Sequence, residues 1–239
     1  LLFWLAEVYY HYLVLTPRDF NRSIILASGI TGGTFIAAAL FSSAIFKWYP
    51  RYARFWRLRR YLGVSGFAFV TIHVLSVTQF VFMGNLLGVY YSFNPLENPL
   101  LFGAFAYYIL LAMALTSTDW MMKKMGRWWK FLHRFVYTAF ASSILHFIFT
   151  SPENLMNPPG YLLIIMVVLA VFGQLFWFFK ITLQKNFRSL GTVVGFSIII
   201  LFLIFLWLGF RRQAEINRPF RAAQENAQNT NRQSTPRLA

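Results

Sequence analysis

Cysteine is absent from this 239-residue chain. Its absence excludes disulfides, iron–sulfur clusters, thiolate metal sites and the C-x-x-C-H attachment of c-type heme. Any bound metal must therefore be held by nitrogen or oxygen. The chain also lacks a glycine-rich phosphate-binding loop, an internal repeat and the serine, histidine and aspartate spacing of a catalytic triad.

Charged side chains are scarce as well, at 12% of the residues against 58% hydrophobic ones. This balance lies far outside the usual composition of soluble proteins. The apolar residues form blocks of about twenty, the length that a helix needs to span a hydrocarbon core of ~30 Å. The sequence therefore predicts an all-α integral membrane protein, a bundle of six transmembrane helices. We expect these helices at 23–46, 61–83, 98–118, 130–150, 159–180 and 191–210.

The two ends of the chain differ from this pattern. The apolar block within residues 1–22 is too short to span a bilayer, and we interpret it as part of a longer helix or as an interfacial helix. The tail at 211–239 is rich in Arg, Asn and Gln and offers little apolar surface to bury. We expect the tail and the additional helix at 191–210 to dock onto a protein partner. The alternative is a tail folded onto the chain's own periplasmic loops.

Acidic residues number only 7 against 22 Lys and Arg, which gives a net charge of +15. In a soluble protein this excess would suggest nucleic acid, but here the basic residues occupy alternate loops, as expected of cytoplasmic loops in a membrane protein. Those loops are 47–60, 119–130 and 180–188. The loops at 84–97 and 151–158 carry Glu97 and Glu153 without any basic residue. The sequence therefore predicts a multi-pass protein of a bacterial inner membrane, with no nucleic-acid partner.

Three of the four histidines fall inside predicted spans, where an imidazole needs a hydrogen-bond partner, a metal or a water-filled cavity. His73 lies ~18 Å and His146 ~24 Å from the cytoplasmic ends of their helices, so both belong to the outer half of the bilayer. Small side chains lie on the same helical faces, at Gly66 before His73 and at Ala139 and Ser142 before His146. A large flat group could approach there. Heme with two axial imidazoles is the obvious candidate.

A simpler interpretation is that these small faces let helices pack closely and that the two histidines bond across the interface. His133 favours the heme interpretation, because it lies ~19.5 Å nearer the cytoplasm than His146 on the same helix. This spacing suits a second electron-transfer site. The His133 side chain, however, points roughly 140° away from that of His146 on an ideal helix. No second histidine occurs at its level. A heme there would need an unusual second ligand, and a structural role for His133 remains open.

Other polar residues have two interpretations each. Arg59, Arg60 and Arg134 could bind heme propionates or simply contact lipid headgroups. His11 lies among tyrosines, and we expect an interfacial residue rather than a ligand.

Three stretches resemble the ferric reductase-like transmembrane family, and within it the MsrQ type of heme-binding membrane subunit. They are RRYLGVSGFAFVTIH at 59–73, ALTSTDWMMKKMGRWWKFLHRFVY at 114–137 and LH at 145–146. The resemblance covers roughly residues 30 to 180 and implies a heme-binding helical bundle over 23–190. His73, His146 and His133 match the heme histidines of the family. The additional helix and the tail do not belong to its pattern.

The resemblance implies a b-type cytochrome that relays electrons from a cytosolic flavoprotein reductase to a periplasmic redox partner. The expected cofactor is heme b, with a second heme and FMN as further candidates. Only 29 residues follow Phe210, so the chain has no room for a nucleotide-binding domain and would act as an electron-transfer subunit. The alternative is a structural or accessory subunit of a larger membrane complex. A quinone-linked cytochrome b is a third hypothesis, for which the predicted spans offer no acidic proton-relay residue.

Overall fold

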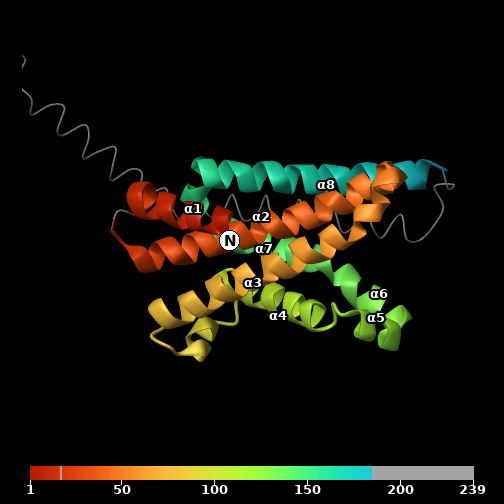
Figure 1. Ribbon diagram of the computed structural model, residues 1–239. Helices are drawn as coiled ribbons and strands as arrows, with labels where there is room; N and C mark the ends of the chain where they lie inside the picture. The colour runs from red at the N-terminus through yellow and green to blue at the C-terminus, as the bar shows by residue number, and fades with distance from the viewer. Residues whose placement is uncertain (17, 185–239) are drawn as a thin grey trace, which may run out of the picture. The chain divides into compact units, whose positions relative to one another are not determined.

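The structure, a computed structural model, describes residues 1–16 and 18–184, and these contain helices and no β-strand. The predicted helix at 191–210 and the tail at 211–239 lie outside the described residues. The main helices, shown in Figure 1, follow in chain order. They are α1 (Leu2–Tyr10), α2 (Phe20–Trp48), α3 (Trp56–Phe80), α4 (Leu100–Leu115), α5 (Asp119–Met125), α6 (Arg127–Leu132), α7 (Val136–Thr150) and α8 (Pro158–Gln184).

Short helical turns join these elements. A π-helical turn (His11–Leu15) follows α1, and 3₁₀ turns lie at Pro50–Phe55, Leu86–Tyr90, His133–Phe135 and Pro152–Met156. The second of these five turns connects α2 to α3, and the fourth connects α6 to α7. The predicted span at 130–150 is therefore interrupted at His133.

Within the described residues, three helices are long and apolar enough to cross a membrane, namely α2, α3 with its preceding turn, and α8. A fourth span results if α4 and α5, which meet at an angle of 96°, are counted together. The predicted all-helical membrane class is confirmed, whereas the count of six spans is not. Part of the difference arises at α4 and α7, whose 16 and 15 residues fall short of the roughly twenty that a bilayer core requires. The sixth predicted span, 191–210, lies outside the described residues.

Local sequence explains where these helices begin and end. The Asp19 side chain accepts a hydrogen bond of 3.0 Å from the backbone N–H of Arg22 and so caps the start of α2. Pro50 lies two residues after the end of α2, where a helix cannot easily continue. Thr118 caps α5 through its hydroxyl, and this cap begins a new helix instead of extending α4 to residue 118 as predicted.

Helices α2 and α3 approach each other through glycine. A Cβ atom added to Gly32 would lie 2.7 Å from the Val70 side chain and 3.1 Å from the Gly66 carbonyl oxygen. A Cβ atom added to Gly66 would lie 2.9 Å from the Ile36 side chain. Only glycine permits two backbones to come this close. Gly66 therefore packs α3 onto α2 and does not open the cleft beside His73 that its position on the helix suggests.

The core of the bundle joins four helices. Its buried side chains come from α2, α4, α7 and α8: Ile36, Ala37, Leu40, Ala106, Leu110, Ala139, Phe140 and Ala170. Ala139 is fully buried in this cluster, and the Ser142 hydroxyl donates a 2.8 Å hydrogen bond to the carbonyl oxygen of Phe102 on α4. These small residues of α7 therefore serve close helix packing, as the simpler interpretation of the sequence proposed.

The N-terminal segment packs against the bundle. Trp4 on α1 donates a 2.9 Å hydrogen bond from its indole N–H to the Ser28 hydroxyl on α2, and its ring lies 6.0 Å from that of Phe69 on α3. His11 follows α1 and has 0% of its surface exposed. Helix packing therefore buries the imidazole inside the bundle, which the expectation of an interfacial residue did not include.

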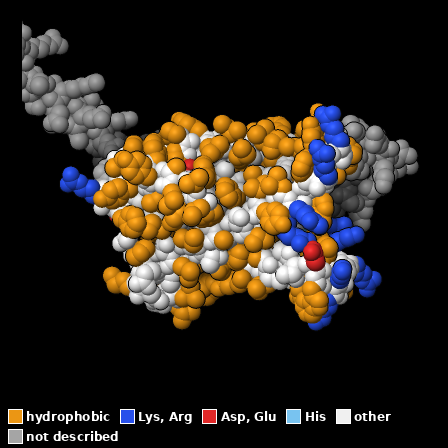
Figure 2. All heavy atoms as spheres, in the orientation of Figure 1, with side chains coloured by type: hydrophobic (Ala, Val, Ile, Leu, Met, Phe, Trp, Pro, Cys, Tyr) orange, Lys and Arg blue, Asp and Glu red, His pale blue; other side chains and the backbone are white. Residues whose placement is uncertain are grey.

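The surface in Figure 2 divides into two regions. Apolar side chains cover most of this face, as expected where lipid is the solvent. Lys and Arg side chains gather at the end where α3 begins and where α5 and α6 lie. The molecule thus has an apolar body and one strongly basic end.

Candidate functional site: two paired histidines

His73 is held by α2 although it belongs to α3. Its Nδ1 atom lies 2.8 Å from the carbonyl oxygen of Ile25. A carbonyl oxygen can only accept, so Nδ1 carries the proton and the lone pair belongs to Nε2. The ring lies against Gly29, where an added Cβ atom would approach Nδ1 to 3.1 Å. The absence of a side chain at Gly29 gives the imidazole its room.

His146 on α7 repeats this arrangement against α4. Its Nδ1 atom lies 3.2 Å from the carbonyl oxygen of Pro99, which again assigns the proton to Nδ1. An added Cβ atom at Gly103 would lie 3.0–3.1 Å from three atoms of the ring. Each imidazole is thus fixed by one backbone carbonyl and one glycine of a neighbouring helix.

The two rings lie close together. Their centroids lie 6.2 Å apart, with an angle of 73° between the ring planes. Two imidazoles on opposite sides of one metal ion, each at a metal–nitrogen distance of about 2.0–2.1 Å, would have centroids about 6.4 Å apart. The observed separation is close to this value, so His73 and His146 are the residues that would hold such a metal group. Among the described residues, neither Nε2 atom makes a hydrogen bond.

The hydrogen bonds at Nδ1 are typical of ligating histidines. A metal-binding imidazole usually donates its other N–H to a carbonyl or carboxylate, which fixes the tautomer and orients the free nitrogen. Ile25 and Pro99 supply these acceptors. The residues present therefore fit a metal group that takes two neutral imidazole nitrogens, such as an iron porphyrin.

His133 lies apart from this pair, in the 3₁₀ turn between α6 and α7. Its Nε2 atom lies 3.3 Å from the Thr116 hydroxyl, and the Trp129 ring stacks on it at a centroid distance of 4.0 Å. Trp129 in turn donates a 2.9 Å hydrogen bond to the carbonyl oxygen of Thr116. No group of three or more His, Asp or Glu side chains that could hold a metal occurs in the described part of the chain.

The 3₁₀ turn changes the direction in which His133 points. A 3₁₀ turn rotates the chain by about 120° per residue, against about 100° in an α-helix, so the three residues of the turn add about 60°. The angle between the His133 and His146 side chains therefore falls from roughly 140° to roughly 80°. The break in the helix thus relieves part of the geometric conflict seen in the sequence. It does not supply His133 with a second histidine.

The three arginines named from the sequence lie near the basic end. Arg60 donates a 2.6 Å hydrogen bond to Asp119, which ties α3 to α5. This hydrogen bond, together with the charge of Arg60, lowers the pKa of the exposed Asp119 carboxyl below its usual value. Arg59 and Arg60 both lie close enough to act electrostatically on His133. Arg59 and Arg134 are exposed.

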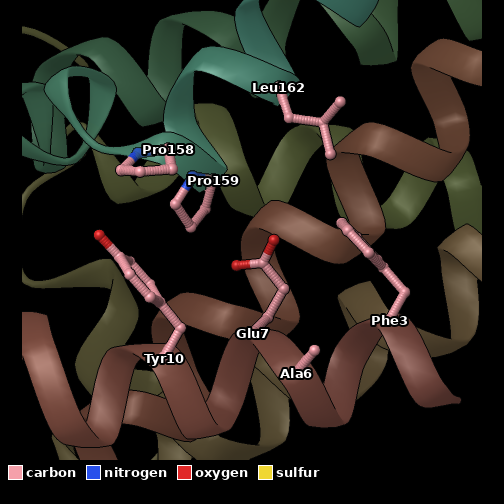
Figure 3. A pocket seen from close by; sticks show the side chains of 7 residues that line it. All are labelled: Phe3, Ala6, Glu7, Tyr10, Pro158, Pro159 and Leu162. Carbon is pink, nitrogen blue, oxygen red and sulfur yellow. The ribbon is translucent and has the colours of Figure 1, made fainter.

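Sequence reasoning missed one buried ionisable residue, the neighbour of His11. Glu7 on α1 is 5% exposed, and its Oε2 atom lies 3.7 Å from Nε2 of His11. The sequence does indicate this pair, because Glu7 is an acidic residue inside an apolar block and His11 follows it four positions later, on the same face of a helix. The interpretation of residues 1–22 as part of a longer helix or as an interfacial helix assigned no role to Glu7, which lines the groove between α1 and the start of α8 (Figure 3).

An apolar helical bundle that holds two imidazoles with their ring centroids 6.2 Å apart suits a metal or porphyrin group. A family model described as "Ferric reductase like transmembrane component" matches residues 28–144. This match contains Gly29, His73, Gly103 and His133, and His146 lies two residues beyond it.

Three relatives carry the same name, "Protein-methionine-sulfoxide reductase heme-binding subunit MsrQ". The protein from Enterobacter sp. (strain 638) is 30% identical over 179 residues, 75% of this chain and 84% of the relative. One from Klebsiella pneumoniae subsp. pneumoniae is 32% identical over 146 residues, 61% and 69% of the two chains. One from Klebsiella pneumoniae (strain 342) is 36% identical over 115 residues, 48% of this chain and little more than half, 57%, of the relative. No solved structure matches the chain.

The chain belongs to the ferric reductase-like transmembrane family, among the MsrQ-type subunits.

Proposed function

We propose that this chain is a membrane b-type cytochrome that holds one heme between His73 and His146. It relays electrons from a cytosolic flavoprotein to an acceptor on the periplasmic side of a bacterial inner membrane. The heme supplies a centre that is reduced and oxidised by one electron. The names of the MsrQ relatives, which describe heme-binding subunits, support this cofactor.

The observation that carries the proposal is the geometry of the two imidazoles. Both have Nδ1 engaged by a backbone carbonyl oxygen, neither Nε2 is hydrogen-bonded to a described residue, and their centroids lie 6.2 Å apart. Helix packing accounts for the Nδ1 hydrogen bonds to Ile25 and Pro99 alone. One metal group held between the two rings would also engage both Nε2 atoms.

The chain's own residues would set the properties of the site. The carbonyl oxygens of Ile25 and Pro99 hold the proton on Nδ1 and so keep Nε2 in its neutral, ligating form. Gly29 and Gly103 allow the imidazoles to lie flat against α2 and α4. Burial in a bundle of apolar helices keeps water from the centre and tunes its potential.

The direction of transfer is proposed from the charge distribution. The basic end contains the loops at 47–60 and 119–130, which are expected to face the cytoplasm. An acidic flavoprotein would be steered to this end by its positive potential. His133 lies between the basic loop at 119–130 and His146 along the chain, and Trp129 at the end of that loop stacks on it. We propose that both residues lie on the route of the electron.

Difference spectra of purified protein test the proposal. Reduced-minus-oxidised spectra of the wild type should show a low-spin b-type heme. Substitution of His73 or His146 by Ala should abolish that signal, whereas His133→Ala should retain it. Added imidazole should restore part of the signal in the two outer variants, because it can replace the missing ligand. An undiminished low-spin spectrum in both outer variants would refute the assignment.

The second candidate function is that of a structural or accessory subunit of a membrane complex. The observation that favours it is that Gly66, Ala139 and Ser142 serve helix packing. A structural subunit would show no heme signal when purified from cells that make heme in excess. The same spectra therefore decide between the two functions.

A further inference from the structure

Asn98 lies just before α4 and is completely buried, with 0% of its surface exposed. Its side-chain amide donates two hydrogen bonds to the loop at 84–97, one of 2.8 Å to the carbonyl oxygen of Val89 and one of 2.9 Å to that of Ser92. Its side-chain carbonyl oxygen accepts a bond of 3.2 Å from the backbone N–H of Leu100, in the first turn of α4. One side chain therefore fastens this loop to the start of α4.

The residue after Asn98 is Pro99, whose carbonyl oxygen accepts the hydrogen bond from Nδ1 of His146. The same oxygen accepts a second bond, of 3.2 Å, from the backbone N–H of Phe102. The proline ring holds φ of Pro99 at −63°, and the bond to Phe102 holds the carbonyl on its other side. The carbonyl oxygen therefore moves with the first turn of α4, which Asn98 holds in place.

The other histidine of the pair has no comparable need. His73 is bonded to the carbonyl oxygen of Ile25, which lies inside α2, where the helix itself fixes the backbone. Pro99 lies at the end of α4, where no earlier turn of helix holds the chain and where helices fray. Asn98 supplies the support that an earlier turn would give.

The loop at 84–97 has further hydrogen bonds of its own. The Glu97 carboxylate accepts a bond of 3.0 Å from the Ser92 hydroxyl and one of 2.9 Å from the Asn94 amide. The Tyr90 hydroxyl lies 2.7 Å from that of Tyr108 on α4, which ties the loop to the helix a second time. These bonds do not involve the buried asparagine. The loop therefore keeps its own structure when that side chain is replaced, and the protein should still fold.

We propose that Asn98 is a positioning residue for His146: it fixes the Pro99 carbonyl oxygen and thereby the tautomer and orientation of the His146 ring. The effect of Asn98 on a heme rests in addition on the proposed function. A hydrogen bond from Nδ1 makes an imidazole a more basic ligand, which favours ferric over ferrous iron. Asn98 therefore lowers the reduction potential of a heme held by His146.

Exchange of the His146 Nδ1 proton with solvent tests the positioning role without reference to heme. The full-length protein in lipid nanodiscs, labelled with ¹⁵N-histidine and kept reduced, has only 4 histidines to resolve. Loss of one signal in His146→Ala assigns the Nδ1–H resonance of that residue. Asn98→Ala should speed its exchange about tenfold, because the acceptor is no longer held in place, and should leave the exchange at His73 unchanged.

The reduction potential of the heme is a second measurement, and a purely structural role would not change it. Loss of the oriented hydrogen bond should weaken the binding of ferric heme about tenfold relative to ferrous heme. A tenfold change in this ratio raises the midpoint potential by about 59 mV. Redox titration of the wild type and Asn98→Ala measures this difference.

Two further variants separate the positioning role from other effects. Ser92→Ala is the matched control, because it removes the hydroxyl that bonds Glu97 but keeps the carbonyl oxygen that accepts from Asn98. It should behave as the wild type in both measurements. Asn98→Asp keeps an acceptor for the N–H of Leu100 and loses both donors to the loop. It should behave as Asn98→Ala does.

Unchanged proton exchange in Asn98→Ala would overturn the proposal, whether or not the protein contains heme. Wild-type exchange in Asn98→Asp would also overturn it, because the cap on α4 would then suffice without the bonds to the loop. Faster exchange in Ser92→Ala, equal to that in Asn98→Ala, would assign the effect to a loosened loop and contradict the role of Asn98. A wild type without heme would refute the proposed function alone, since the exchange measurement still decides the role of Asn98.

Discussion

Substitution of Gly103 by Ala should loosen heme binding while leaving the fold intact. The new Cβ atom would lie 3.0–3.1 Å from three atoms of the His146 ring. Carbon atoms in ordinary contact are about 3.5–4.0 Å apart, so the imidazole must move by about 0.5 Å. That movement lengthens the bond to the Pro99 carbonyl oxygen, already 3.2 Å, beyond hydrogen-bonding distance.

The magnitudes predict different effects on the fold and on the site. Overpacking costs about 1–3 kcal/mol, partly offset by the gain of about 1 kcal/mol in helix propensity when Ala replaces Gly. The net loss of stability is therefore small, about 0–2 kcal/mol. Loss of a partner that orients a metal ligand typically costs 10–100-fold in metal affinity. We expect heme loss to be faster by about the same factor.

The assay is the rate at which purified protein loses heme to an excess of a heme-scavenging protein. Gly63→Ala is the matched control, because an added Cβ atom there has no neighbour within 4 Å and the residue lies on α3, as His73 does. Gly29→Ala should repeat the effect at His73, where the added atom would approach Nδ1 to 3.1 Å. Equal rates of heme loss in the Gly103→Ala and Gly63→Ala proteins would refute the role assigned to Gly103.

Three further predictions concern packing and charge. Gly66→Ala should lower the thermal unfolding temperature far more than Gly103→Ala does, because the added atom meets the backbone of α2. Asp119→Asn removes the carboxylate that accepts the hydrogen bond from Arg60. Because the pKa of Asp119 is lowered in the folded protein, the ionised carboxylate stabilises the fold above its unfolded pKa of about 3.9, and this stabilisation disappears as pH falls through the folded pKa. Thermal unfolding temperatures of this variant and the wild type should therefore converge at low pH. Charge reversal at Lys123 and Lys124 should slow the reduction of this protein by an acidic flavoprotein, and the difference in rate should shrink as salt is added. Reduction rates that change neither with the charge reversal nor with salt would contradict docking of the electron donor at the basic end.

The sequence was sufficient to predict that His73 and His146 approach each other. Their depths along two helices of known direction place them in the same half of the bilayer, and the structure brings their rings together. The count of spans could not be predicted in the same way. Hydropathy does not register the Thr118 cap, which begins a new helix where the predicted span 98–118 ends, or the 3₁₀ turn at His133, which divides 130–150.

The partners of the two histidines also lay beyond sequence reasoning. Small residues on the same helix as each histidine were the natural candidates for a cleft, yet Gly66 and Ala139 are used for helix packing. The glycines that contact the imidazoles are Gly29 and Gly103, on neighbouring helices. Which residues of two helices meet depends on their rotation and relative shift, and neither is encoded in the pattern of a single helix.

The ratio of heme to polypeptide tests the central claim most directly, when measured on purified wild-type protein and on the His73→Ala, His146→Ala double variant. We predict one heme per chain in the wild type and none in the double variant. Absence of heme from the wild type, or an unchanged ratio in the double variant, would contradict the assignment of the histidine pair as the heme site.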